Sequence, residues 1–280
     1  MTGTLKKYFP LFVIPTLAAF LIGFLVPFVM GIGLSFCDFT TVTDARFTGF
    51  ENYTKAFSDA GFIHSLWYTA LFTAASVVTI NVLAFVVALL LTKGIKGKHV
   101  FRTVFFMPNL IGGIVLGWIW QLILNGILSG FGVTLTFSAT YGFFGLLILT
   151  NWQQIGYMMI IYIAGIQNIP EDVLEAALID GASPRAMLFR VKIPMLMPCV
   201  TICTFLTLTN SFKLFDQNLS LTNGMPSGKS EMLALNIYNT FYGRAGWEGA
   251  GQAKAVVFFL IVGLIVLVQL KLTRSKEVEG

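Results

Sequence analysis

The chain has 280 residues, of which 56% are hydrophobic and only 11% are charged. A soluble globular domain carries about 25% charged residues, so this composition excludes a soluble protein and indicates an integral membrane protein. The net charge of +5 does not indicate a nucleic-acid-binding protein, because the basic residues stand in short clusters between apolar runs.

Six apolar runs are long enough to cross a bilayer, which takes about 20 helical residues. The first run follows Lys6 and Lys7. It is too long for a signal peptide and no A-x-A cleavage site follows it, so we expect a retained transmembrane helix. With their polar connections the spans form a single transmembrane domain over residues 1–280. The expected spans are residues 8–36, 65–92, 101–124, 141–166, 193–215 and 252–272.

The distribution of lysine and arginine predicts the orientation of the spans. Placing both termini in the cytoplasm puts twelve of these residues, including Lys276, in inner segments and six, including Lys254, in outer segments. The inner loops are also the shorter ones. The connection between the fourth and fifth spans, residues 168–192, therefore falls on the cytoplasmic side.

The cysteines and histidines do not suggest a metal site or a disulfide framework. The three cysteines are an odd number. Cys199 and Cys203 lie four residues apart on one face of a span, without a histidine or carboxylate at ligand spacing, so we expect them to be packing residues. His64 and His99 have no partner in sequence and are expected to be interfacial.

Residues 168–192 read as a helix, a glycine bend and a second helix. Pro170 fits the first helical position, and Gly181 suits a left-handed residue that stops the first helix. Ser183 and Pro184 form a new N-cap and first position, and the second helix is expected to end before Pro194. An ordinary amphipathic connector is the alternative interpretation of this segment.

The order of residues in this connection resembles the EAA loop of ABC-importer permeases. Glu175, Ala176 and Ala177 match the first part of that motif, and Asp180, Gly181, Ala182 and Pro194 match the rest. Leu188 and Ile193 stand where the family has Phe and Leu. The resemblance implies that this loop is the cytoplasmic coupling helix, which sits in a cleft of an ATPase subunit. We expect Glu175 and Gly181 to carry the coupling.

Other segments extend the resemblance to nearly the whole chain, and it is closest to maltose-type carbohydrate permeases. Residues 47–57, FTGFENYTKAF, are similar to the segment after the first span of that family, and residues 221–226, LTNGMP, to the turn after the fifth span. The resemblance implies an all-α membrane protein with six transmembrane helices, the type I ABC importer permease fold and a cytoplasmic coupling helix.

Polar residues inside the spans mark a candidate substrate pathway, because such residues usually face a bundle interior or a cavity. The third span is broken by Pro108 and Asn109, then by Gly112 and Gly113. Proline frees a backbone carbonyl and glycine thins the helix, so backbone is expected to line a cavity there. A kink for helix packing is the alternative.

The fourth span holds a second polar group, formed by Thr150, Trp152, Gln153 and Gln154. Amides can donate to and accept from hydroxyl groups, and an indole can stack on a pyranose, so this set suits a neutral sugar. Hydrogen bonds between helices are the alternative.

A third polar group lies in the fifth span, where Thr207 and Ser211 are four residues apart and share a helix face. Lys213 and Asp216 follow and are expected to neutralise each other as a solvated pair. Carried over residue by residue, the family's sugar contacts fall on Asn109, Gly113, Thr150, Gln153, Gln154, Thr207 and Ser211.

Two absences narrow the functional class. No P-loop is present, so the chain itself is not expected to be an enzyme or to bind a cofactor, and ATP and Mg would belong to partner ATPase subunits. No charged residue is expected near the middle of a span, which argues against a proton- or sodium-coupled carrier.

We therefore expect a permease subunit of an ATP-driven sugar importer in the bacterial plasma (inner) membrane. It would form half of the translocation pathway in a heterodimer with a second permease. Two ATP-binding cassette subunits and an extracytoplasmic sugar-binding protein complete the importer, which would carry an oligosaccharide or monosaccharide across the lipid bilayer. Import of a polyol or sugar phosphate by the same architecture is the first alternative. An ATPase-independent carrier or channel and a non-transporting scaffold are further alternatives.

Overall fold

The computed structural model of the protein describes residues 2–274, so Lys276 lies outside the described residues. Within that range the chain is predominantly helical, and its one sheet is a two-stranded hairpin. Four helices are long and apolar enough to cross a membrane: Val13–Leu34, Ala60–Leu91, Ala139–Gln167 and Glu248–Leu272.

Two further spans are possible if each of two bent helix pairs counts as one. The first pair joins Lys98–Leu110 to Gly113–Ser129 with a bend of 103°, and the second joins Pro184–Met195 to Met197–Phe212 with a bend of 67°. The expected helical membrane fold is thus confirmed, and the six expected transmembrane helices correspond to four spans, or to six if each bent pair is one span. The individual span boundaries and the single domain over residues 1–280 stay predictions.

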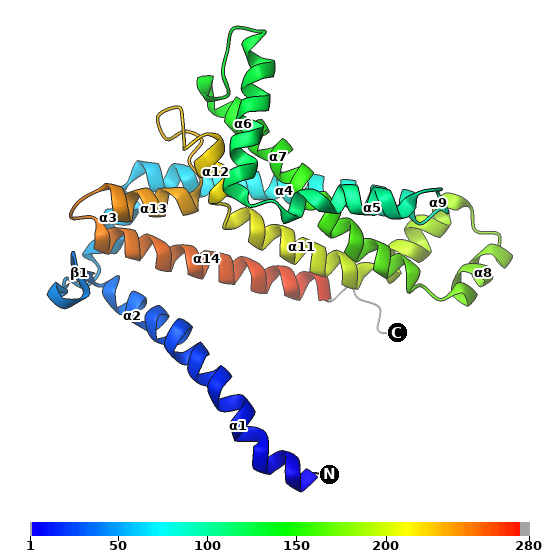
Figure 1. Ribbon diagram of the computed structural model, residues 1–280, viewed down its shortest axis with the longest axis horizontal. Helices are drawn as coiled ribbons and strands as arrows, with labels where there is room; N and C mark the ends of the chain where they lie inside the picture. The colour runs from blue at the N-terminus through cyan, green and yellow to red at the C-terminus, as the bar shows by residue number, and fades with distance from the viewer. Residues whose placement is uncertain (1, 275–280) are drawn as a thin grey trace. The chain divides into compact units, whose positions relative to one another are not determined.

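By contacts, the described chain divides into two compact units, which are described in turn. Unit 1 consists of Met1–Phe62 and Ile237–Leu260, and unit 2 of Ile63–Asn236 and Ile261–Gly280. Residues of three helices belong partly to each unit: α4 (Ala60–Leu91), α13 (Leu233–Gly243) and α14 (Glu248–Arg274) (Figure 1).

Unit 1 is organised around the segment that follows the first apolar helix. Asn52, in the first turn of α3, is buried and its Nδ2 donates to the carbonyls of Ser35 (3.1 Å) and Cys37 (2.8 Å). Gly249 packs against the same amide, because a Cβ there would lie 2.5 Å from Asn52 Nδ2. The further elements of unit 1 are α1 (Thr2–Phe20), the π-helical turn η1 (Leu21–Leu25), α2 (Val26–Leu34), β1 (Cys37–Asp38), η2 (Val42–Asp44), β2 (Arg46–Phe47) and α3 (Glu51–Ser58).

The sequence places Lys254 in an outer segment and gives no sign that it is buried. In the structure Lys254 lies near the start of α14, and its side chain is wholly buried. Its Nζ lies 2.7 Å from Oδ2 of Asp59 and donates to Oγ1 of Thr240 at 2.7 Å. Sequence periodicity could not reveal this contact, because Asp59 and Lys254 are 195 residues apart.

Unit 2 holds the bent helix pairs and the connection between the fourth and fifth expected spans. Its core helix is α7, which contacts α5, α6, α11 and α12 (Figure 1). The elements of unit 2 are α5 (Lys98–Phe106), η3 (Met107–Leu110), α6 (Gly113–Ser129), η4 (Leu135–Phe137), α7 (Ala139–Gln167), α8 (Glu171–Ile179), α9 (Pro184–Ala186), the π-helical η5 (Met187–Lys192), α10 (Ile193–Met195), α11 (Met197–Phe212) and α12 (Asp216–Leu221).

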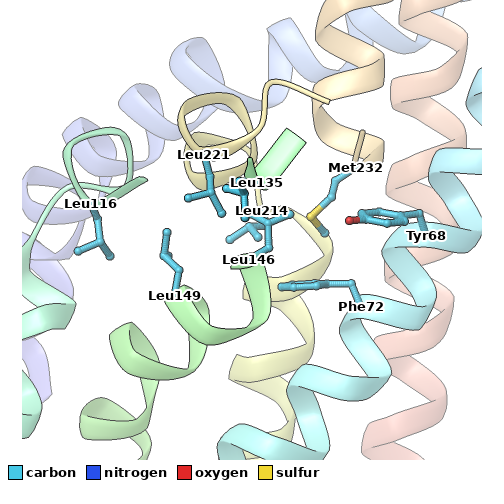
Figure 2. Close-up of a cluster of buried hydrophobic side chains, with 9 residues drawn as sticks. All are labelled: Tyr68, Phe72, Leu116, Leu135, Leu146, Leu149, Leu214, Leu221 and Met232. Atoms are coloured by element: carbon cyan, nitrogen blue, oxygen red, sulfur yellow. The ribbon is translucent and has the colours of Figure 1, made fainter. Parts of the chain in front are cut away.

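Two apolar clusters hold unit 2 together. Figure 2 shows the first, in which Leu146 and Leu149 of α7 meet Leu221 of α12 and the ring of Phe72 from α4. The second cluster joins α4, α7 and α11 and contains Cys203, which is fully buried. The expectation that the two neighbouring cysteines are packing residues is confirmed. Among the described residues no group of metal-ligand side chains was found.

Small residues let the helices of unit 2 approach each other closely. Gly156 of α7 lies against the backbone of α5, where an added Cβ would overlap the carbonyl of Phe105. Gly113 and Gly117, one turn apart on α6, lie against α12 in the same way, because an added Cβ would meet Asp216 or Ser220. This spacing of small residues is the usual device for close helix packing in membranes.

Candidate functional site

A polar cavity of about 290 Å³ lies in unit 2, at the place where the third span is broken. Its lining comes from η3, α7, the end of α11 and the start of α12. The lining is dominated by amide side chains, with one lysine and one aspartate. The lining residues are Asn109, Gln153, Gln154, Asn210, Lys213, Leu214, Phe215, Asp216 and Gln217.

The break in the third span supplies both a side chain and a backbone group to this region. The chain narrows to the 3-10 turn η3 at Pro108 and becomes extended at Ile111 and Gly112 before α6 begins. Asn109 thereby lines the cavity, and the carbonyl of Ile111, freed from helical hydrogen bonding, accepts from Gln153 Nε2 at 3.3 Å. The observed bend of 103° agrees with the expected interruption at these residues.

The two glutamines of α7 differ in how they are paired. The side-chain oxygen Oε1 of Gln153 accepts a hydrogen bond from Gln217 Nε2 at 2.8 Å. Gln154 is only 6% exposed, and its Oε1 has no hydrogen-bond partner among the described residues. A buried acceptor without a partner is costly, so Gln154 contributes an unsatisfied polar group to the wall of the cavity.

Two of the expected pathway hydroxyls lie away from the cavity lining. Thr150 is fully buried and donates to the carbonyl of Leu146 one turn earlier, at 2.6 Å. Thr207 is likewise buried and donates to the carbonyl of Cys203 at 2.8 Å. It also accepts from Asn81 Nδ2 of α4 at 3.3 Å. This arrangement corresponds to the alternative in which polar groups in the spans bond within and between helices.

The remaining residues expected in the pathway, Ser211, Trp152 and Gly113, do not line the cavity. Ser211 is fully buried, and its hydroxyl has no hydrogen-bond partner among the described residues. Trp152 is 43% exposed and its ring packs edge-on against Trp120, with centroids 5.6 Å apart, outside the cavity lining. Gly113 does not line the cavity but lets Asp216 and Gln217 approach α6 closely. The roles of these residues stay predictions.

Six cavity residues were not proposed as site residues from the sequence: the apolar Leu214 and Phe215, and the polar Asn210, Lys213, Asp216 and Gln217. The polar run that ends α11 was a visible signal for Asn210, whereas Gln217 had none. The expectation that Lys213 and Asp216 pair with each other is wrong for the described structure, whose ion pairs join Glu51 to Lys55 and Asp59 to both Arg244 and Lys254. Both residues are exposed and line the cavity, because α11 ends at Phe212 and α12 begins at Asp216.

The connection over residues 168–192 forms the expected helix, bend and helix. Pro170 is the residue before α8 rather than its first residue, because its ψ of 134° is extended. Gly181 adopts a φ of +76°, and the N–H groups of Gly181 and Ala182 bond back to the carbonyls of Leu178 (3.0 Å) and Ala177 (2.9 Å). The left-handed glycine stop is therefore confirmed.

The second helix differs from the expectation at its end. The hydroxyl of Ser183 caps it by accepting from Ala186 N–H at 3.3 Å, as expected. The helix does not end before Pro194, however, but continues to Met195 through the π-helical turn η5. The wider π turn accommodates a proline that can donate no hydrogen bond. The bend comes instead at Leu196, before Pro198 in the first turn of α11.

The surface of α8 is more apolar than the motif residues suggest. Glu175, Ala176, Asp180 and Gly181 are exposed, and Ala177 and Ala182 are half-buried. The most exposed apolar residue of the segment is Ile179, at 86%, with Leu178 beside it at 63%.

Comparisons with known proteins agree with this architecture. The family model described as "Binding-protein-dependent transport system inner membrane component" matches residues 80–274. The chain is 44% identical over 278 residues to a probable starch degradation products transport system permease protein, AmyD, from Thermoanaerobacterium thermosulfurigenes, covering 96% of this chain and 94% of that protein. It is 30% identical to the trehalose/maltose transport system permease protein MalF from Thermococcus litoralis, covering 95% and 94%.

A solved structure has the same fold at low sequence identity. It is the crystal structure of a bacterial ABC transporter involved in the import of the acidic polysaccharide alginate, with a TM-score of 0.82 and 20% identity over 97% of each chain. The relatives are transport permeases and not enzymes. The chain therefore belongs to the family of binding-protein-dependent transport system inner membrane components, as a multi-pass permease subunit of the carbohydrate ABC-importer kind with the type I fold.

Proposed function

We propose that this chain forms half of the translocation pathway of an ATP-driven importer of neutral saccharides. The observation that carries the proposal is the cavity at the broken third span, which is lined by the amides of Asn109, Gln153, Gln154, Asn210 and Gln217. Amides both donate and accept hydrogen bonds, which suits the hydroxyl groups of a sugar. The names of the relatives AmyD and MalF, which refer to starch degradation products and to trehalose and maltose, support the same substrate class.

We propose that the coupling to ATP hydrolysis runs through Glu175–Ala182. Three features support this role: the rigid glycine bend at Gly181, the exposed carboxylate of Glu175 and the exposed apolar pair Leu178 and Ile179. A short helix that presents exposed aliphatic side chains is suited to insert into a groove of another protein. Closure of an ATPase dimer would then move α8 as a lever.

The family membership supports a proposed assembly of several subunits. A second permease, distinct from this chain, would complete the pathway, and two cytoplasmic ATP-binding cassette subunits would hold ATP and Mg. An extracytoplasmic binding protein would deliver the sugar. One alginate transporter structure is described as a complex with an alginate pentasaccharide-bound periplasmic protein, which supports this component. The charge distribution supports an inner-membrane orientation with both termini in the cytoplasm.

An anionic solute, such as a sugar phosphate, is the second candidate because Lys213 lines the cavity. Its ammonium group could neutralise a phosphate or carboxylate. Asp216, which lines the same cavity, carries the opposite charge and would repel such a solute. The balance of charges therefore favours a neutral substrate.

Purification from the native membrane in mild detergent, followed by mass spectrometry of the associated proteins, tests the assembly. A second permease and an ATPase are expected to accompany the chain. Ile179→Asp should remove the ATPase but not the second permease. Phe137→Asp is the matched control, because Phe137 is 67% exposed but lies in a loop expected on the other side of the membrane. Isolation of the chain alone would contradict the proposal.

Uptake by proteoliposomes containing the complete importer tests the substrate class. ATP-dependent accumulation of radiolabelled maltose or maltotriose is expected, whereas glucose 6-phosphate should not accumulate. If the anionic sugar is taken up in preference, and Lys213→Met abolishes its uptake, the second candidate is correct. Uptake that persists without ATP would favour a carrier or channel instead.

A further inference from the structure

Gln217 is held between two other parts of the cavity wall. Its Nε2 donates to Gln153 Oε1 at 2.8 Å. On the other side it lies against Gly113, where an added Cβ would be 3.0 Å from both Cδ and Nε2 of Gln217. The side-chain amide of Gln217 therefore has a defined position, set by the absence of a side chain at residue 113.

The direction of these hydrogen bonds is determined by the backbone. The carbonyl of Ile111 can only accept, so Gln153 must direct its Nε2 towards it, at 3.3 Å. Gln153 must then direct Oε1 towards Gln217, which has to donate. The side-chain oxygen of Gln153 has two lone pairs, and one of them is thus already engaged by another side chain of the cavity lining.

The helix that carries Gln217 is anchored independently of this bond. Gln121 Nε2 of α6 donates to the carbonyl of Leu221 at 2.9 Å. Asn218, next to Gln217, is fully buried, and its Nδ2 donates to the carbonyl of Ser230 at 2.8 Å. With the backbone of α12 fixed, the Gln153–Gln217 bond can open by rotation of a side chain without movement of the helix.

We propose that Gln217 is a positioning residue that competes with the solute for Gln153. In the absence of solute its amide occupies one lone pair of Gln153 Oε1; a sugar hydroxyl that enters the cavity competes for that lone pair and replaces Gln217 as its donor. Gln154, whose buried carbonyl oxygen has no partner among the described residues, lies in the same wall and has no such competing donor. This inference rests on the proposed saccharide function.

A solute hydroxyl that must displace an existing hydrogen bond binds more weakly than one that meets an acceptor with no partner. The solute gains a bond to Gln153 only as the Gln153–Gln217 bond is lost, so the net gain is small. Weak holding of the sugar favours its release to the cytoplasm. Removal of the competing donor should therefore strengthen binding, whereas loss of an ordinary sugar contact would weaken it.

The direct test is equilibrium dialysis of radiolabelled maltotriose against the purified importer without its binding protein, so that the measured Kd reports the permease cavity. Gln217→Leu is expected to lower this Kd about fivefold, the effect of one net hydrogen bond. Gln217→Met, which keeps the length of the side chain but cannot donate, should have the same effect. An unchanged or raised Kd in variants that retain wild-type thermal unfolding would overturn the proposal.

Two controls separate competition from general loosening of α12. Gln121→Leu removes the hydrogen bond between α6 and the carbonyl of Leu221 in α12. Because Gln121 lies outside the cavity lining, the Kd of this variant for maltotriose should equal that of the wild type. In a Gln153→Leu background, Gln217→Leu should have no further effect, because the acceptor for which it competes is gone. The proposal would also be overturned if Gln121→Leu lowered the Kd as much as Gln217→Leu does. The same holds if the double variant had a lower Kd than Gln153→Leu alone.

The same preparation distinguishes this inference from the function on which it rests. If the wild-type importer takes up maltotriose with ATP but its Kd is unaffected by Gln217→Leu, only the role of Gln217 is wrong. If the wild type neither binds nor accumulates maltose or maltotriose, the saccharide function and the role of Gln217 are both overturned.

Discussion

The ammonium group of Lys254 lies 2.7 Å from the carboxylate of Asp59, with no solvent exposure of the lysine side chain. The same Asp59 oxygen is 3.0 Å from Arg244, which is partly exposed. Lys254 also lies over the ring of Phe62, 5.2 Å from its centroid. This cluster joins the start of α4 to α14 within unit 1, where a buried charge must be paired to be tolerated.

Lys254→Met should destabilise the protein by about 3 kcal/mol, the lower part of the range for a broken buried ion pair, because Arg244 still neutralises Asp59. The midpoint of thermal unfolding in detergent measures the effect. Adding Asp59→Asn to Lys254→Met should recover part of the loss. The control is Lys55→Met. The ion pair between Lys55 and Glu51 has both side chains exposed and contributes less than about 1 kcal/mol to stability. Equal effects of the two lysine substitutions would contradict this account.

The pH dependence of stability should contain a contribution from Asp59. Burial raises the pKa of this carboxyl, but the hydrogen bond and charge of Lys254, the Gly61 N–H and the charge of Arg244 outweigh burial and leave the pKa below its usual value. A carboxyl with a lowered pKa stabilises the fold above its unfolded pKa of about 4 and loses that contribution as pH falls through the folded value.

The difference in unfolding temperature between the wild type and Asp59→Asn should accordingly be largest near neutral pH and shrink below about pH 4. Unfolding scans of both proteins between pH 3 and pH 7 measure it. A difference that stays constant across this range would show that the ion pair does not carry the pH dependence.

Gly181→Asp should leave membrane insertion intact but uncouple ATP hydrolysis from transport, so that ATP is hydrolysed with less sugar accumulated. The φ of +76° at this position costs a residue with a Cβ about 1–2 kcal/mol, which corresponds to roughly a tenfold loss of the productive conformation. No atom lies within 4 Å of the position of a Cβ, so the effect is one of backbone strain and not of overlap.

The ratio of ATP hydrolysed to sugar accumulated in proteoliposomes measures this coupling. Gly181→Ala is the matched variant, because alanine bears the full cost of the left-handed region whereas aspartate tolerates it better, so Gly181→Ala should impair coupling at least as much. Normal transport by both Gly181→Asp and Gly181→Ala would contradict a lever role for the bend.

Close packing of α7 on α5 should make Gly156 sensitive to a single methyl group. Gly156→Ala would force the Cβ onto the carbonyl of Phe105 and should destabilise the protein by about 2 kcal/mol. Gly126→Ala, in α6 with no atom within 4 Å of the Cβ position, should be neutral or stabilising by up to about 1 kcal/mol. Thermal unfolding of the two variants in the same detergent provides the comparison, and similar midpoints would argue against tight α5–α7 packing.

Local patterns in the sequence were sufficient for several features of the fold. Long apolar runs predicted the helices that can span a membrane, and the order Pro170, Gly181, Ser183 predicted the helix, bend and helix of the connection. The break at Pro108 and Asn109 was also predictable. These features depend on hydrophobic length, capping and backbone freedom, which are properties of neighbouring residues.

The composition of the cavity and the burial of Lys254 required the tertiary structure. Gln217 and Gln153 are 64 residues apart, and Asp59 and Lys254 are 195 apart, so no periodicity links them. Thr150 and Gln153 are close in sequence, but helix rotation buries the first against its own backbone and directs the second into the cavity. The sequence by itself determined which segments are helical, apolar and interrupted. Only packing decided which polar groups share a cavity, because that depends on how helices distant along the chain are rotated and brought into contact.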